Sequence, residues 1–255
     1  MAETAARLDP GALRRAAGRL RRARSVLALT GAGISAESGI PTFREAQTGL
    51  WAQFDPAELA TPEAFERNPE LVWQWYAWRR KLATDAAPNP GHQALASFES
   101  RFDDFTLVTQ NVDSLHQRAG SRRVIEYHGN LLRTVCSRDG ATIETADPTD
   151  VKLPRCPACG AAGRPGVVWF GELIPAEALT AAAEAADRCD VFLSIGTSSL
   201  VYPAAGLAEA ALRAGAFIIE ANPAETPLSR LADVVLRGPA GESLPALAAA
   251  LEGPA

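Results

Sequence analysis

The stretch Leu29-Thr30-Gly31-Ala32-Gly33-Ile34-Ser35-Ala36 decides the fold of this 255-residue chain. The apolar run Val26–Leu29 leads into it and predicts a short buried strand. The pattern after the strand is G-x-G-x-x-A, in which glycines permit a tight turn and a close approach of the backbone to a pyrophosphate. The sequence therefore predicts a phosphate-binding loop at residues 31–36, although glycine turns without a ligand also follow many strands.

Three further apolar runs share this design, because polar residues follow each of them directly. The runs are Thr106–Thr109, Val191–Ile195 and Phe217–Glu220, and the loops after them are Gln110-Asn111-Val112-Asp113, Gly196-Thr197-Ser198-Ser199 and Ala221-Asn222-Pro223. Val234–Leu236 is a weaker candidate strand. Helical segments alternate with these runs, which predicts an α/β fold with a Rossmann-like, doubly wound parallel sheet. Ligands bind at the carboxyl ends of such strands, so the loops predict one composite site.

Two segments interrupt the alternation and predict a smaller lobe. Residues 43–91 have a helical pattern and are aromatic, and residues 133–165 are rich in glycine and proline and carry three of the four cysteines. We expect a helical module from the first segment and a cysteine-bearing insertion from the second. Residues 1–42, 92–132 and 166–255 would then form the large Rossmann-like domain.

The composition argues against several classes of protein. An apolar fraction of 47% supports a packed core, and a net charge of −5 argues against a nucleic-acid partner. No apolar run is long enough to cross a membrane. The segment Ala6–Arg24 has the composition of a transit peptide, but Asp9 and Pro10 form a good helix start and favour a helix that packs on the sheet. We expect a cytoplasmic monomer.

The acidic residue with which ordinary dehydrogenases bind the ribose is missing about 20 residues after the glycines. That stretch holds Trp51 to Asp55 and does not end a strand. The chain is therefore not an ordinary dehydrogenase, and we expect Ser198 and Asn222 to hold the ribose.

Five segments resemble, in the same order, the motifs of the sirtuin family. They are Gly31–Arg44, Gln110–Asp113, Tyr127-His128-Gly129-Asn130, Val167–Glu172 and Gly196–Ser198. The resemblance spans most of the chain and implies a Rossmann-like domain that binds NAD and a small lobe with a zinc ribbon. It also implies transfer of an acyl group from the lysine side chains of proteins to ADP-ribose, with release of nicotinamide.

A histidine is the expected general base, because its side chain titrates near the working pH. His92 follows Asn89-Pro90-Gly91 at a helix start and suits a cap, and His116 lies in a predicted helix and suits a structural contact. His128 follows the strand-like run Val124–Glu126 and matches the catalytic histidine that the resemblance implies.

The resemblance assigns further residues to the NAD and peptide sites. Asn111 and Asp113 would orient the nicotinamide ribose and a bound water, with helix capping as the alternative. Phe43 would cover the emptied nicotinamide site, with core packing as the alternative. The peptide would add as a strand beside Val168-Trp169-Phe170-Gly171. The remaining expected NAD contacts are Arg44, Gln110, Gly196, Thr197, Pro223 and Ala240.

The predicted helix Pro69–Ala83 carries a candidate acyl pocket. Helical spacing predicts its core face to be Leu71, Trp75, Trp78 and Leu82. Tyr76 and Arg79 then lie on the flank, where a hydroxyl beside a guanidinium can bind a carboxylate. This Tyr-x-x-Arg pair resembles class III sirtuins, which bind malonyl-, succinyl- or glutaryl-lysine. The alternative is a surface arginine on a flank that Arg80 and Lys81 also solvate.

Two knuckles predict the metal site. Cys156-Pro-Ala-Cys159-Gly160 is a complete C-x-x-C knuckle, whereas the other reads Cys136-Ser-Arg-Asp139-Gly140. Zinc accepts carboxylate oxygen as well as thiolate, so three cysteines and Asp139 would form a closed structural site. The alternative is a decayed site that keeps its turn without metal. Cys189 stands apart and is expected to be a small buried residue.

Other readings of the same residues stay open at this point. A glycohydrolase or an ADP-ribosyltransferase would use the same loops and His128 but would not need the Tyr76–Arg79 pair. A non-catalytic sensor of NAD or ADP-ribose would need neither His128 nor Asn111. An interaction module built on the metal ribbon would leave the polar strand-end loops unexplained.

Overall fold

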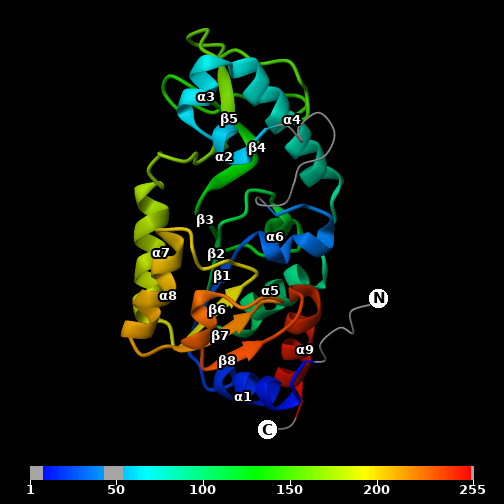
Figure 1. Cartoon of the computed structure of the whole chain (residues 1–255), viewed down its shortest axis with the longest axis vertical. Coiled ribbons are helices and arrows are strands. Elements are labelled where there is room, and N and C mark those ends of the chain that lie inside the picture. The colour runs from blue at the N-terminus through cyan, green and yellow to red at the C-terminus, as the bar shows by residue number, and fades with distance from the viewer. Residues whose placement is uncertain (1–7, 43–53, 254–255) are drawn as a thin grey trace.

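The computed structural model describes residues 8–42 and 54–253 and is built on a six-stranded parallel sheet (Figure 1). The strands lie side by side in the order β3-β2-β1-β6-β7-β8, which is the order of the dinucleotide-binding Rossmann fold. Their bounds are β1 Ser25–Thr30, β2 Asp104–Thr109, β3 Val124–Glu126, β6 Val191–Ile195, β7 Phe217–Ala221 and β8 Val234–Leu236. The predicted fold class is confirmed. Phe43 and Arg44 lie outside the described residues.

Helices cover both faces of the sheet, as the alternating pattern predicts. One face is covered by α1 Pro10–Leu20, α5 Pro90–Arg101 and α9 Ala240–Glu252, and the other by α7 Ala176–Arg188 and α8 Ala204–Arg213. Successive side chains of β1 alternate between the layers, with Val26 in the first and Leu27 in the second. Burial on both faces explains why the strands are continuous apolar runs.

Helix α1 begins at the predicted cap. The Asp9 carboxylate accepts hydrogen bonds from the backbone N–H groups of Gly11 and Ala12 at 2.9 and 3.0 Å. Leu20 is fully buried in the core that α1 shares with the sheet. The segment is therefore a structural part of the fold. None of the helices in the described ranges is long and apolar enough to cross a membrane.

The smaller lobe lies away from the sheet, in the upper part of Figure 1. It comprises the helices α2 Pro56–Leu59, α3 Pro62–Arg67 and α4 Pro69–Asp85 and the antiparallel ribbon of β4 Gly129–Cys136 and β5 Gly163–Val167. In its core, the ring of Trp169 lies 5.3 Å from that of Phe65 and 6.4 Å from that of Tyr76. The division of the chain at residues 43, 92, 133 and 166 stays a prediction.

The buried face of α4 differs from the predicted one. Trp75 is buried as expected, but the other three predicted core residues, Leu71, Trp78 and Leu82, are only partly buried. Tyr76 and Arg80 are instead 2% and 0% exposed. Because α4 contacts both α3 and the ribbon, burial extends beyond its apolar stripe.

Arg80 shows why hydropathy misses this face. Its guanidinium donates to the carbonyl oxygens of Leu131 at 2.5 Å and Arg133 at 3.2 Å, and it lies 4.2 Å from the ring centroid of Trp73. Burial lowers the pKa of Arg80 to about 10, so the side chain stays charged and is satisfied by carbonyls and an aromatic ring. Arg80 therefore links α4 to the ribbon and does not solvate the flank beside Arg79.

Candidate functional site

The first glycine loop meets the loop after β6 where the strand order reverses. The N–H of Gly31 donates to the carbonyl of Ile195 at 3.0 Å, and that of Gly33 to the carbonyl of Gly196 at 2.8 Å. A Cβ atom on Gly33 would lie 2.7 Å from the Cα of Gly196. The glycines therefore permit the two loops to pack against each other at the sheet edge where such folds bind their ligands.

A buried hydrogen-bond network joins the first two polar loops. The Ser35 hydroxyl donates to the Asp113 carboxylate at 2.7 Å and accepts from the Asn111 amide at 3.1 Å. The same amide donates to the carbonyl of Gly31 at 3.1 Å. The second oxygen of Asp113 accepts from the N–H of Leu115 at 2.9 Å, at the start of α6 Leu115–Arg118. The structure thus brings Ser35, Asn111 and Asp113 together and fixes their rotamers.

His128 lies between β3 and β4 with its tautomer defined by a main-chain contact. Its Nδ1 is 3.1 Å from the carbonyl oxygen of Gln110, which can only accept, so Nδ1 carries the proton and Nε2 keeps a lone pair. Burial lowers the pKa of His128, and the Gln110 contact opposes this effect. The carbonyl of His128 accepts from the N–H of Val168 at 2.9 Å. A neutral imidazole is therefore held directly beside the start of the predicted peptide strand.

The other two histidines have structural roles. Nδ1 of His92 accepts from the N–H of Asn89 at 3.3 Å and completes a capping box at the start of α5, which confirms the predicted cap. Nε2 of His116 lies 2.9 Å from the Thr30 hydroxyl, and its ring centroid is 4.8 Å from that of His92. Burial lowers the pKa of His92 to about 4 and that of His116 to about 3. Both rings are therefore neutral in the folded protein at neutral pH.

This buried pair predicts a loss of stability in mild acid. In the unfolded chain His92 and His116 bind protons below about pH 6.5, whereas in the folded chain they stay neutral down to about pH 4 and about pH 3. The folded state is therefore not penalised by these histidines above pH 6.5. It loses stability relative to the unfolded chain as the pH falls from 6.5 toward the pKa values of the folded state. We expect the free energy of unfolding to decrease by about 2 kcal/mol per histidine between pH 7.5 and pH 5. Urea unfolding at the two pH values measures it, and an unchanged midpoint would contradict it.

Side-chain amides join the third polar loop to the second and to the fourth. The amide of Gln110 donates to the Thr197 hydroxyl at 3.2 Å, and that of Asn222 donates to the Thr197 carbonyl at 2.8 Å. The side-chain oxygen of Asn222 accepts from the N–H of Ala224 at 3.1 Å. Arg237 also binds the carbonyls of this loop, at Asn222 and Ala224. Asn222 thus joins two loops of the predicted NAD site, a role that the sequence does not reveal.

Ala240, the last expected NAD residue, opens α9 and is 3% exposed. At this helix start, the Glu37 carboxylate accepts from the N–H of Gly241 at 2.6 Å. A negative charge is favoured at a helix N-terminus. Glu37 therefore fastens the segment after the glycine loop to α9. No periodic pattern in the sequence indicates this contact, because the two segments are far apart along the chain.

The predicted peptide strand follows β5 directly, and its successive side chains alternate between buried and exposed. Phe170 is 50% exposed, and its N–H donates to the carbonyl of Ala60 at 2.9 Å, whereas Trp169 is 3% exposed and packs in the small lobe. Gly171 has a φ of 86°, a left-handed conformation that favours glycine and ends the extended run. The segment is therefore anchored to the helical module on one side and to His128 on the other.

An ion pair that sequence reasoning missed holds this segment. Arg164 donates to both carboxylate oxygens of Glu172, at 2.6 and 2.7 Å. Glu172 also accepts from the N–H of Trp169 at 2.8 Å, and the Arg164 guanidinium lies 3.6 Å from the ring centroid of Trp169. The sequence feature that could have indicated this ion pair is the presence of opposite charges eight residues apart, on either side of the predicted peptide strand.

Tyr76 and Arg79 lie close together behind Trp169. The Tyr76 hydroxyl oxygen accepts from Nε1 of Trp169 at 3.0 Å. The Arg79 guanidinium lies 4.9 Å from the ring centroid of Trp75 and 5.6 Å from that of Tyr76. Burial lowers the pKa of Arg79, and Tyr76 and Asp113 oppose this effect. The structure therefore brings the predicted pair together, with Tyr76 in the core of the lobe and not on a half-exposed flank.

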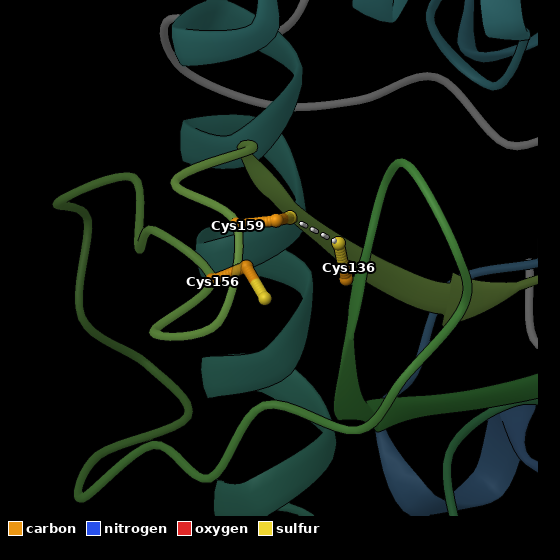
Figure 2. Close-up of side chains that lie close together, drawn as sticks. All are labelled: Cys136, Cys156 and Cys159. Atoms are coloured by element: carbon orange, nitrogen blue, oxygen red, sulfur yellow. Dashed lines mark hydrogen bonds between the residues drawn. The ribbon is translucent and has the colours of Figure 1, made fainter.

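The three ribbon cysteines converge at the far end of β4 (Figure 2). The sulfurs of Cys136, Cys156 and Cys159 all lie within 4.8 Å of one another, and those of Cys136 and Cys159 are 3.5 Å apart. Three converging thiols fit a zinc site. The carboxylate of Asp139 is not among the atoms that lie within 4.8 Å of one another, but it neighbours the Cys136 thiol and accepts from the backbone N–H of Ala141 at 3.0 Å, so it holds the turn of the first knuckle. Cys189 is 6% exposed in the large core, as expected.

Known proteins resemble this chain along most of its length. The Sir2 family model matches residues 31–203. An NAD-dependent protein deacylase of Aquifex aeolicus is 52% identical over 221 residues, which are 86% of this chain and 92% of that protein. An NAD-dependent protein deacylase of Ralstonia nicotianae is 53% identical over 232 residues, which are 89% of this chain and 92% of that protein.

Solved structures agree with these relatives. The crystal structure of a Sir2 homologue–NAD complex has a TM-score of 0.89 and 45% identity and covers 98% of this chain and 96% of its own. The structure of Sir2Af2 bound to a myristoylated histone peptide has a TM-score of 0.79 and 35% identity, and covers 96% of this chain and 98% of its own. The motifs, the sheet order and the three-cysteine ribbon lead to the same conclusion. The chain belongs to the Sir2 family of NAD-dependent protein deacylases.

Proposed function

We propose that the enzyme removes acyl groups ending in a carboxylate (malonyl, succinyl or glutaryl), as well as acetyl, from lysine side chains of proteins. The observation that carries the proposal is the pair of Tyr76 and Arg79 behind Trp169. A hydroxyl beside a guanidinium suits a carboxylate, and a half-buried arginine gains more from a charged ligand than a fully exposed one does. The acyl group would pass to ADP-ribose, with release of nicotinamide.

His128 is the proposed general base. The bond between nicotinamide and ribose in NAD⁺ supplies an activated carbon that the acyl oxygen can attack. Nε2 of His128, whose lone pair is left free by the contact with Gln110, would then accept a proton from a ribose hydroxyl. Asn111 and Asp113, locked in place by Ser35, would orient that ribose.

The peptide would extend along Val168–Gly171 as an added strand. Because the backbone N–H of Val168 donates a hydrogen bond to the carbonyl of His128, an acyl-lysine bound beside Val168 would lie next to the proposed base. Leu200 and Tyr202 are 54% and 64% exposed just after the third NAD loop, and large exposed apolar side chains beside a site support a further peptide contact. Sequence reasoning missed these two because apolar residues before a helix resemble core.

The acyl preference has a direct test in Arg79→Met. We expect this variant to lower kcat/KM for a succinyl-lysine peptide by about 10²-fold, because it removes the guanidinium that would bind the succinyl carboxylate. The value of kcat/KM for the acetyl form of the same peptide should fall far less, because an acetyl group has no carboxylate. Lys81→Met, which removes an exposed charge from the same helix, is the matched control. Parallel losses for both peptides would argue against a carboxylate site.

We also propose that Cys136, Asp139, Cys156 and Cys159 bind one structural zinc ion. The convergence of the three sulfurs supports it, and Asp139 stands in the first knuckle where Cys159 stands in the second. We expect removal of zinc with a chelator to lower the melting temperature, because a structural metal stabilises only the folded state. Asp139→Cys should raise zinc affinity in competition with a chromophoric chelator, and Ser137→Ala, in the same turn, should not. Equal affinities would exclude position 139 as a ligand.

We also propose that the enzyme works in the cytoplasm. All four cysteines are free, which supports a reducing compartment such as the cytoplasm. The monomeric state and the lack of a nucleic-acid partner stay predictions.

A further inference from the structure

We infer that Trp169 is a specificity-determining residue, whose indole N–H orients the Tyr76 hydroxyl so that the hydroxyl hydrogen points toward the carboxylate of the acyl group. The inference rests on the proposed acyl preference and identifies the side chain that sets it. Tyr76 and Arg79 supply the contact with the ligand, and Trp169 acts through Tyr76.

The direction of the bond between Trp169 and Tyr76 is fixed by chemistry. An indole N–H only donates, so at 3.0 Å the Tyr76 oxygen must be the acceptor. A phenol has one hydrogen and two acceptor positions. The contact with Trp169 therefore occupies one acceptor position and leaves the hydrogen for another partner.

Arg79 restricts the hydroxyl from a second side. Its guanidinium lies 5.6 Å from the ring centroid of Tyr76 and, like the indole, can only donate hydrogen bonds. Neither the Trp169 N–H nor the Arg79 guanidinium can therefore accept the hydrogen of the Tyr76 hydroxyl. Tyr76 is 2% exposed, and burial raises the pKa of its hydroxyl, so the group keeps its hydrogen and is poorly hydrated. Among residues 8–42 and 54–253 the Tyr76 hydroxyl has Trp169 as its side-chain hydrogen-bond partner, which is a donor, so a bound acceptor would complete its hydrogen bonding.

Trp169 is itself held in one orientation. Its backbone N–H donates to the Glu172 carboxylate and its ring faces the Arg164 guanidinium, and Arg164 and Glu172 form a bidentate ion pair. Phe65 lies 5.3 Å away, centroid to centroid. A side chain held at both its backbone and its ring does not have to be ordered when the ligand binds, so the pocket is preorganised.

The resulting site selects one class of acyl group. A carboxylate at the end of a short acyl chain offers two acceptor oxygens, one for the Tyr76 hydroxyl and one for the Arg79 guanidinium. An acetyl group has no polar atom beyond its amide oxygen. Binding acetyl-lysine therefore leaves the Tyr76 hydrogen without an acceptor from the substrate, which costs affinity in a buried site.

The test is Trp169→Phe, which removes the N–H and keeps an aromatic ring. We expect the ratio of kcat/KM for succinyl-lysine to that for acetyl-lysine, measured with one peptide sequence, to fall about 10-fold. The fall should be mainly a rise in KM for the succinyl peptide, because the carboxylate does not take part in the bond-making step. Both substrates are measured on the same preparation, so a partly unfolded variant does not change the ratio.

Trp73→Phe is the matched control. Trp73 is also buried in the small lobe, and its Nε1 donates to the carbonyl of Asp150 at 2.9 Å, away from the Tyr76 hydroxyl. We expect this variant to lower the melting temperature and to leave the succinyl-to-acetyl ratio unchanged. A change of the ratio in both variants would show that loss of packing, and not the Trp169 N–H, alters selectivity.

A double-mutant cycle completes the test, because it separates action through Tyr76 from independent effects. In a Tyr76→Phe background, Trp169→Phe should lower the ratio no further. Additive losses would overturn the inference. If the wild-type enzyme does not prefer succinyl-lysine and Arg79→Met leaves its ratio unchanged, the proposed function fails. If both hold and Trp169→Phe keeps the wild-type ratio, only the role of Trp169 fails.

Discussion

Replacement of His128 by alanine should lower kcat for NAD-dependent deacylation by between about 10²- and 10⁴-fold, the usual contribution of a general base. The structure supports this because Nδ1 is committed to the Gln110 carbonyl and Nε2 keeps its lone pair. Burial also lowers the pKa of the imidazole, so the base form persists into mild acid. We therefore expect wild-type kcat to be flat above pH 6.5 and to fall only at lower pH, and single-turnover assays across this range measure it.

The fold and the cofactor site should survive this change. His128 is only partly buried, and its main-chain bond to Val168 does not depend on the side chain. ADP-ribose binding and the melting temperature of the variant are the controls, and both should stay near the wild-type values. Turnover close to that of the wild type would show that another group removes the proton.

Replacement of Gly33 by alanine should have the largest effect on stability. The added Cβ would lie 2.7 Å from both the Cα and the carbonyl oxygen of Gly196, and neither backbone can move without separating β1 from β6. We expect a loss of about 5 kcal/mol or more, comparable to the whole stability of many domains. Urea unfolding and NAD binding by calorimetry measure the two consequences together.

Gly18→Ala is the matched control for this prediction. Gly18 lies inside α1, and a Cβ atom added there would meet nothing within 4 Å. Alanine is favoured over glycine in a helix, so this variant should be slightly more stable than the wild type. A small loss in Gly33→Ala, similar in size to the effect at Gly18, would show that the two loops can separate at little cost.

The sheet was predictable from the sequence because its strands are buried on both faces. A short continuous apolar run such as Val191–Ile195, bounded by polar loops, is typical of a buried strand, and the polar loop after it marks the carboxyl end of that strand. The first glycine loop was predictable for a similar reason, since Gly31 and Gly33 satisfy a backbone requirement that other residues do not meet. These are local constraints, and a local pattern expresses them.

The small lobe was less predictable because its burial is decided by distant segments. Arg80 is fully buried only because β4 brings carbonyl oxygens to it, 51 and 53 residues along the chain. The contact of Trp169 with Tyr76 likewise depends on how the segment after β5 lies against α4. Hydropathy assigns an arginine to the surface whenever its partners are main-chain groups from elsewhere.

The ribbon of β4 and β5 connects the three-cysteine group to the segments that carry His128 and Val168. One end pairs Gly129, next to His128, with Val167, next to Val168, and the other end pairs Cys136 with Gly163. The register shifts between Asn130 and Thr134, so the two paired ends are separated by an irregular segment of β4. The cysteine knuckles lie at the end of the ribbon that is remote from His128 and Val168. Loss of order in the knuckles should therefore disturb the pairing near Cys136 first, and a displacement of the whole ribbon would move the proposed base and the proposed peptide strand while the dinucleotide loops stay in place.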